Sequence, residues 1–375
     1  MIKSIYVFNV GYGDCAILSN SDNCAMLVDC GSTYKKKSSN VIGLNSTQIY
    51  VDDVAEKVEE IMMKFDKKYL LISHLHNDHF NCLQYFKNIV FDEVYLPNYL
   101  DNNYLDITFA EILLCKEKRR NNLIALLNIP HLLGKHKLIN NNTRIKFVNA
   151  NDKIYNDLGT FEILAPQKKK YKFNNNICGL LRKNETINDL KLKYLNQFVE
   201  ADNKDFYSFK NNQDMYNLIY TKTLNNNFDQ INLIKKYEKE IKSYYYKLHN
   251  DLSIVFHNIY NDNYKVLFCG DSKTSNLKKI NKYHEKYKVI KVSHHGTEDY
   301  YFEYLPKTDY LIINNTKYRN YKKISKKYDD MYGSDSILIC TDNNNCEKIC
   351  NNISCNCVMN KKAICKIKKY YEVIK

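Results

Sequence analysis

The chain has 375 residues, of which 44% are hydrophobic and 26% charged, so it is long enough to bury one large core or two ordinary ones. Its net charge is +14, but the lysines are spread along the chain, which favours a solvated basic surface over a dedicated nucleic-acid groove. The sequence has no signal-peptide pattern and no apolar run of the roughly 20 residues that cross a bilayer. We therefore expect a soluble, cytoplasmic protein without membrane contact.

Thirteen cysteines are scattered through the sequence, an odd number that argues against a disulfide framework. Six of them cluster near the C-terminus: Cys340, Cys346, Cys350, Cys355, Cys357 and Cys365. No C-x-x-C pair occurs among these six, so reduced thiols are favoured there over a structural zinc site, which remains the alternative.

Strands and helices alternate along the first part of the chain, which predicts an α/β layered fold. Residues 51–65 form an amphipathic helix, because Val54, Val58, Ile61 and Phe65 follow a helical period. A second helix is expected at residues 80–88. Strands are expected at residues 4–10, 15–18, 24–28, 69–72, 90–96, 144–148 and 160–164.

The character of the sequence changes after residue 166. Residues 167–248 are rich in Asn, Lys and Tyr and contain the helix-like stretch 230–248, so we interpret them as a helical insertion or cap. A second α/β half follows, with strands expected at residues 253–259, 265–269, 289–292 and 310–313. The expected organisation is a first half (1–166), the insertion (167–248), a second half (249–342) and a Cys-rich tail (343–375).

The strongest chemical motif is His74-Leu75-His76-Asn77-Asp78-His79, directly after a buried strand. Strand ends are where sites collect in α/β proteins, and the alternate residues His74 and His76 can reach one ion. Asp78 and His79 then address a second position nearby. Nitrogen and carboxylate ligands suit zinc, and also manganese or iron, so the motif predicts a metal site rather than surface polarity.

Two further groups of ligand-type residues follow strands in the second half. Asp271 follows one strand in C-G-D-S, and His294 and His295 follow the next in S-H-H-G-T. Each pattern alone is typical of a turn. Their shared position after strands makes a contribution to the same site the better interpretation.

The order of these motifs resembles the metallo-β-lactamase superfamily, and more narrowly the hydrolase domain of ComEC-type DNA-uptake proteins and their free-standing relatives. The resemblance covers residues 1–166 and 249–315. Its segments are F-N-V-G-Y-G-D-C-A-I-L, L-V-D-C-G-S, S-H-L-H-N-D-H-F, F-E-I-L-A-P, N-D-L-S-I-V-F, V-L-F-C-G-D-S and I-K-V-S-H-H-G-T. It implies a four-layer αββα sandwich carrying a helical insertion.

The resemblance also implies the ligand set of two divalent metal ions, with Zn²⁺ favoured and Mn²⁺ as the alternative. His74 and His76 would bind one ion, Asp78 and His79 the other, and Asp271 would bridge them. One of His294 and His295 would complete the second site, leaving the other near the substrate; which is which stays open. Asp14 and Asp29 match positions that shape the site from behind the ligands, with ordinary turn chemistry as the alternative.

The family's further His ligand is missing, since the corresponding region reads V-Y-L-P-N-Y. His131 and His136 come later and are better explained as structural or surface residues. His249, next to the N-D-L-S segment, is a weak site candidate, and His257 and His284 are expected to be structural.

The expected activity is hydrolysis by a metal-bridged hydroxide, with Asp78, Asp271 and His295 as the catalytic residues. A phosphodiester substrate such as DNA, RNA or a smaller diester is the first hypothesis, making the protein a phosphodiesterase or nuclease. The alternatives are an acyl hydrolase acting on a lactone, thioester or amide, and a non-catalytic binding module on the same fold.

Overall fold

The computed structural model describes most of the chain. The described residues are 2–21, 23–34, 50–100, 102–115, 129–167, 175–196, 198–200, 207–209, 232, 234–259, 265–315, 324–325, 327–328, 336–341 and 370–374. Within these ranges, no helix is both long enough and apolar enough to cross a membrane.

The first sheet contains nine strands among the described residues, in the spatial order β16-β1-β2-β3-β4-β5-β6-β10-β9. Their bounds are β1 (Ile2–Phe8), β2 (Cys15–Asn20), β3 (Cys24–Cys30), β4 (Lys67–Leu71), β5 (Glu93–Pro97), β6 (Arg144–Val148), β9 (Phe198–Glu200), β10 (Tyr207–Phe209) and β16 (Tyr370–Ile374). Strands β3 to β6 are parallel, and the strands on either side of them pair antiparallel.

The second sheet contains seven strands in the described part, in the order β15-β14-β13-β12-β11-β8-β7. Their bounds are β7 (Lys153–Asn156), β8 (Gly159–Ala165), β11 (Val255–Asn258), β12 (Val266–Phe268), β13 (Lys286–Lys291), β14 (Lys307–Ile313) and β15 (Ile337–Cys340). Strands β12 to β15 are parallel. Both sheets are therefore mixed, and each has a parallel block whose carboxyl ends can position side chains.

The two sheets pack face to face through one apolar layer. In β3, Met26 and Val28 point into this layer, whereas Ala25 and Leu27 belong to the core on the other face. Alternate residues of a strand point to opposite faces, so both faces of each sheet are buried. The second sheet follows the same pattern, with Phe256 and Phe268 in the shared layer.

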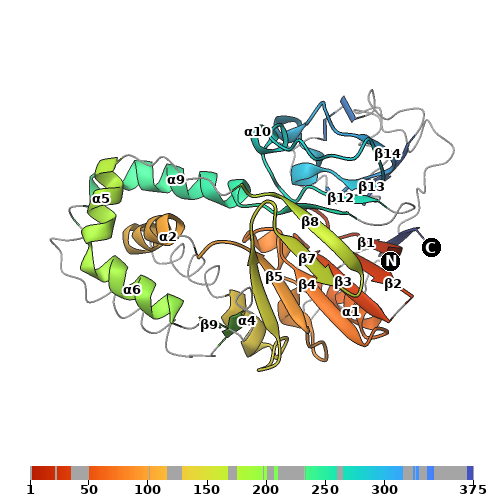
Figure 1. The fold of residues 1–375 in the computed structure, drawn as a ribbon, viewed down its shortest axis with the longest axis horizontal. Coiled ribbons are helices and arrows are strands. Elements are labelled where there is room, and N and C mark those ends of the chain that lie inside the picture. Colours follow the sequence, from red (N-terminus) through yellow and green to blue (C-terminus); the bar gives the residue numbers. More distant parts are fainter. Residues whose placement is uncertain are drawn as a thin grey trace, which may run out of the picture.

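Helices cover the two outer faces (Figure 1). On the first sheet they are α1 (Val51–Met62) and α4 (Ile129–Lys135), whereas α2 (Asn102–Leu114), α5 (Asn175–Lys183), α6 (Glu185–Leu195) and α9 (Glu238–Asp251) form a group of helices beside it. The short helix α10 (Thr274–Leu277) packs on the second sheet. The four-layer αββα arrangement predicted from the sequence is confirmed.

The described part of the insertion packs mainly around α2. Helices α5, α6 and α9 surround it (Figure 1), and their apolar side chains join the core of the first sheet. The segment also contains β9 and β10, which extend that sheet. Its role as a cap over the metal cleft stays a prediction.

The prediction of a helix at residues 80–88 is wrong. This stretch instead contains one short 3₁₀ turn, η2 (Leu83–Tyr85), and follows another, η1 (Asn77–His79). The physical reason is competition from the loop after β3: the Cys82 amide donates to the Cys30 carbonyl at 2.9 Å, and the Asn81 side chain bonds both backbone groups of Ser32. These bonds bind the segment to the first sheet and prevent a regular helix.

The end of the Cys-rich tail forms β16, which pairs with β1 at the edge of the first sheet. Of the six clustered cysteines, Cys340 lies in β15, and the other five lie outside the described residues. Elsewhere, seven cysteines are free thiols, as expected: Cys15, Cys24, Cys30, Cys82, Cys115, Cys178 and Cys269.

Candidate metal centre

The loop after β4 carries four of the predicted ligands and is held tightly by its neighbours. Asp14 donates its backbone amide to the Asp78 carbonyl at 3.0 Å. A Cβ on Gly31 would lie 2.0 Å from the carbonyl carbon of Asp78, so only glycine lets the loop after β3 approach so closely. The backbone thereby fixes where the His74–His79 side chains can point.

A first group of potential ligand atoms consists of His74, His76 and Asp271. His74 Nε2 lies 2.8 Å from His76 Nδ1 and 3.7 Å from Asp271 Oδ2. His74 and Asp271 are fully buried, and His76 is partly exposed. Two imidazoles and a carboxylate oxygen thus face one small volume, as a zinc-type site requires.

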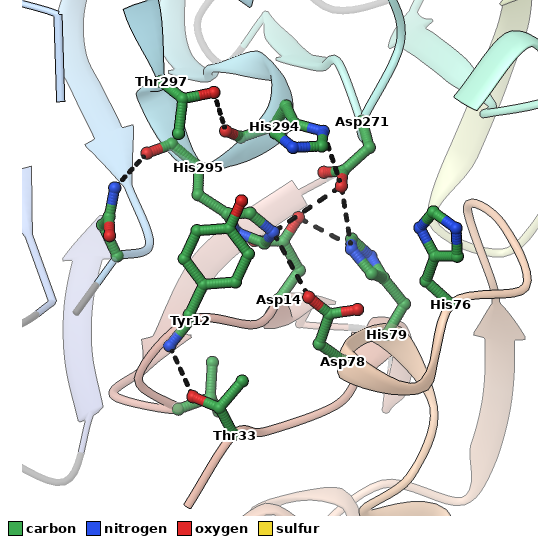
Figure 2. A network of polar contacts seen from close by, with 12 residues as sticks. Tyr12, Asp14, Thr33, His76, Asp78, His79, Asp271, His294, His295 and Thr297 are labelled. Carbon is green, nitrogen blue, oxygen red and sulfur yellow. Dashed lines mark hydrogen bonds and ion pairs between the residues drawn. The ribbon is translucent and has the colours of Figure 1, made fainter. Parts of the chain in front are cut away.

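The second group consists of Asp78, His79 and His295 (Figure 2). His295 Nε2 lies 3.6 Å from Asp78 Oδ2 and 3.6 Å from Asp271 Oδ2, while His79 Nε2 lies 3.5 Å from the same Asp271 oxygen. Asp271 therefore stands between the two groups. A carboxylate in that position can bridge two cations, which is the role that the resemblance implies for Asp271.

The adjacent residues His294 and His295 lie in an unusual backbone turn. His294 has φ 46° and His295 has φ 58°, both in the left-handed region, which costs on the order of 1–3 kcal/mol for a residue other than glycine. Backbone bonds hold the turn: the His294 amide donates to the Gly270 carbonyl at 3.0 Å, and Asn315 donates to the His295 carbonyl at 2.9 Å. A strained conformation held in this way is typical of functional sites.

This turn sends the two imidazoles to different surroundings. His295 is completely buried and packs against Tyr12, with 3.9 Å between ring centroids. His294 is stacked on Tyr300 at 3.8 Å with an interplanar angle of 8°, and its Nδ1 lies 3.1 Å from Asp271 Oδ2. Among the described residues, His295 belongs to a three-ligand group, and His294 belongs to none.

Behind the ligands lie the two aspartates that the resemblance singled out. Asp29 accepts from the Ser73 amide and hydroxyl at 2.6 and 2.7 Å, and lies 2.9 Å from His79 Nδ1. This contact fixes His79 with its Nε2 facing the site. Asp14 Oδ1 faces His295 Nδ1 at 3.6 Å, and the other Asp14 oxygen is bonded to the Lys291 ammonium.

Burial and the surrounding charges shift the pKa values of the cluster. Burial raises the pKa of Asp271, but the imidazoles of His295, His294 and His79 outweigh it and hold that pKa well below its usual value. Burial lowers the pKa of His79, and Asp271 and Asp29 together raise it well above the usual value. Burial lowers the pKa of His76 to about 4, so this imidazole is neutral at pH 7. Protonated imidazoles balance the carboxylates here, and cations bound to the same atoms would take over that balance.

The donor atoms fit a metal ion. Three deeply buried ligand atoms in the described part of the site have no hydrogen-bond partner: His79 Nε2, Asp271 Oδ1 and His295 Nε2. Such atoms are rare, because leaving a buried polar group unsatisfied costs about 1–3 kcal/mol. A pair of cations between the two groups would satisfy them.

The structure brings together all seven residues predicted as ligands. His131 lies in α4, and its side chain is outside the described part, whereas His136 directly follows α4 and belongs to no ligand group among the described residues. His249 lies in α9, and its side chain is outside the described part. His257 and His284 stack on each other at 4.7 Å and contact Tyr287, so they form a separate cluster.

Three residues at the site were missed by the sequence analysis. Asn250 Nδ2 bonds the Tyr300 hydroxyl at 2.7 Å and approaches His294 Nδ1 at 3.4 Å. Lys291 is buried at the end of β13. A signal for Lys291 was present, because a lysine within the apolar run Val289–Val292 needs a buried partner. Asn250 and Tyr300 carried no comparable signal.

Comparison with solved structures finds several similar chains, and one of them is described here. The crystal structure of an isothiocyanate hydrolase from Delia radicum gut bacteria aligns over 89% of this chain and 95% of that chain, with 9% sequence identity and a TM-score of 0.35. No family model matches the sequence, and no curated protein matches it. The character of the site therefore rests on its own side chains.

Proposed function

We propose that the protein is a hydrolase that binds two divalent cations and cleaves phosphodiesters. The observation that carries this proposal is the convergence of five imidazoles and the Asp78 carboxylate around Asp271, from three strand ends, with buried ligand atoms that lack partners. This donor set favours Zn²⁺, with Mn²⁺ as the alternative.

In this proposal His74 and His76 hold the first ion, and Asp78, His79 and His295 hold the second. Asp271 reaches both groups through one carboxylate. His295 is assigned as the ligand because it is buried beside Asp78, whereas His294 lies at the edge of the cluster on Tyr300. The sequence left the choice between the adjacent histidines open, and these surroundings support His295 as the ligand.

When bound, the two ions supply a water of lowered pKa and positive charge opposite the group under attack. The chain's own residues then orient the reaction. Asp271 and Asp78 keep the ligand geometry, and Asp29 fixes the ring of His79. His294 is placed to bind an oxygen of the substrate or to donate a proton to the leaving group, because Tyr300 and Asn250 hold its ring in one orientation.

The substrate class is supported by the resemblance of the motifs to ComEC-type hydrolase domains and by the basic charge of the chain. A net charge of +14 attracts polyanions over long range and raises their local concentration. A phosphodiester of a nucleic acid fits both features better than a neutral ester does.

The test is hydrolysis of bis(p-nitrophenyl) phosphate and of single- and double-stranded DNA and RNA, with Zn²⁺ or Mn²⁺ added. We expect cleavage by the wild type and a loss of at least a hundredfold in Asp271→Asn, which keeps the shape of the side chain but not its charge. Lys288→Met, in β13 of the same sheet but paired with Asp309 instead of the site, serves as the control and should retain activity.

Two outcomes would contradict the proposal in different ways. Equal activity of Asp271→Asn and the wild type would refute the metal mechanism. Hydrolysis of a lactone or thioester panel, with no cleavage of any phosphodiester, would refute the substrate class and leave the metal site standing.

A further inference from the structure

A buried ion pair lies directly behind the candidate metal centre, and none of the proposed chemistry uses it. Lys291 is 4% exposed at the end of β13, and its ammonium bonds Asp14 Oδ2. Asp14 is also 4% exposed. Removing two charges from water costs several kcal/mol per ion, and apolar replacements of such pairs are often as stable. The pair is therefore poorly explained by stability alone.

The location of the pair suggests what it does. Lys291 enters from the second sheet and Asp14 from the loop before β2 in the first, so the contact joins the two sheets beneath the site. A small cavity between the sheets lies beside it, and Asp14, Asp29, Ser73 and Lys291 form part of its lining. The Asp14 oxygen that does not bond Lys291 faces His295 Nδ1.

Asp14 has a second possible role that would compete with this one. Its Oδ2 lies 3.7 Å from His79 Nδ1, and Asp14, His79 and Asp271 together form a third group whose atoms are close enough to hold an ion. The Lys291 ammonium occupies the same Oδ2. A carboxylate oxygen bonded to an ammonium is a poor ligand for a cation, because the two positive charges repel each other.

We propose that Lys291 is a positioning residue: it reserves Asp14 as the partner of His295 Nδ1 and withholds it from the metal ions. This inference rests on the proposed two-metal site. With Asp14 anchored, the His295 ring presents Nε2 to the second ion beside Asp78. Loss of an outer partner of a metal-binding histidine weakens metal affinity about 10- to 100-fold.

The direction in which metal affinity changes when Lys291 is removed distinguishes a positioning role from a purely electrostatic one. If Lys291 acted only through its charge, its removal would strengthen the binding of both cations. If it positions His295 through Asp14, its removal weakens the second ion and leaves the first unchanged. The effect must also disappear when Asp14 can no longer act, since a contribution transmitted through one partner is non-additive with the loss of that partner.

The experiment measures the affinities of the two Zn²⁺ ions by competition with a chromophoric chelator, and follows Co²⁺ absorption as a report on ligand geometry. The proteins are the full-length wild type, Lys291→Met, Asp14→Asn, the double variant, and Lys288→Met. Lys288 is the matched control, because it lies on β13 but contacts Asp309 at 2.9 Å instead of the site. Circular dichroism checks the fold of each variant.

We expect Lys291→Met to weaken the second Zn²⁺ at least tenfold with a changed Co²⁺ spectrum, and Lys288→Met to match the wild type. In the Asp14→Asn background the same lysine substitution should change the second affinity less than twofold. Tighter or unchanged binding by Lys291→Met would overturn the proposal, as would a full tenfold loss in the Asp14→Asn background.

Two further outcomes of the experiment also need an interpretation: a variant that does not fold, and a wild type that binds no metal. If Lys291→Met alone does not fold, the comparison of Asp14→Asn with the double variant, which has no unpaired buried charge, decides the question by the same twofold limit. If the wild type takes up no Zn²⁺ or Co²⁺, the proposed metal site itself is refuted, separately from the role of Lys291.

Discussion

At the scale of single residues, the division of work between His294 and His295 follows from the turn that separates them. Consecutive residues in the left-handed region point their side chains apart, so one imidazole faces inward and the other lies against Tyr300. The inner ring contacts three carboxylates, those of Asp14, Asp78 and Asp271. This asymmetry gives the two histidines distinct, measurable roles.

We predict that His295→Ala loses one bound metal ion per chain, because it removes a ligand from the second group. His294→Ala should keep both ions and lose at least tenfold in kcat, since its ring lies at the edge of the cluster. Metal analysis after dialysis, together with steady-state kinetics, checks both. Loss of an ion from His294→Ala with none lost from His295→Ala would reverse the assignment.

We also predict that Gly31→Ala destabilises the protein by about 1–3 kcal/mol or more, because its Cβ would overlap the backbone of Asp78 and His79. Gly179→Ala is the matched control: an added Cβ there meets no atom within 4 Å, and alanine favours its helix by up to about 1 kcal/mol. Urea unfolding of the two variants measures the difference. Equal stability would show that the loops do not pack as closely as described.

Sequence alone was enough to predict the candidate ligands that the structure brings together, because His74–His79 are close in the chain and follow a recognisable strand. It could not assign His294 and His295, since that choice depends on a backbone turn and on Asp78 from the other half. The contact between Lys291 and Asp14 joins residues 277 positions apart. Local patterns carry no information on such a pair, although the buried lysine itself was visible.

At the scale of elements, some helices that pack against the core can be predicted from the sequence and others cannot. Helix α1 was predicted from its amphipathic period. Helix α2 was not, because it is buried on nearly all sides, where it contacts α5, α6 and α9. A helix buried all round lacks the periodic pattern on which such predictions depend. The strands β7, β9 and β10 were missed for a different reason, since each has only three or four residues.

The packing of the insertion on α2 yields a prediction about stability. Ile187→Ala in α6 should lower the free energy of unfolding by about 2–5 kcal/mol, because Ile187 is completely buried in the core of the first sheet. Leu192→Ala, on the same helix but 60% exposed, should change it by less than about 0.5 kcal/mol. Chemical denaturation measures both. Equal effects of the two substitutions would show that α6 does not pack on α2 as described.

At the scale of the whole molecule, the site lies between the two sheets, and its ligands come from different halves of the chain. His74 to His79 follow β4 of the first sheet, whereas Asp271 and His295 follow β12 and β13 of the second. A cation bound to both sets of ligands would hold the sheets together at this edge. Metal binding should therefore stabilise the whole fold and not only the loops.

We predict that saturating Zn²⁺ raises the unfolding free energy of metal-free protein by about 2.7 kcal/mol at a hundredfold excess over Kd. The same addition should have a much smaller effect on Asp271→Asn, which lacks the bridging charge. Thermal unfolding with and without chelator provides the measurement. Identical unfolding temperatures for the wild type in both conditions would contradict binding across the two halves.

The most direct test of the central claim is the number of metal ions bound per chain, measured by mass spectrometry on purified wild type and Asp271→Asn after dialysis against Zn²⁺ and then metal-free buffer. We predict two ions per wild-type chain and fewer in the variant. A wild-type chain that retains no metal would contradict the account, whatever substrate the protein acts on.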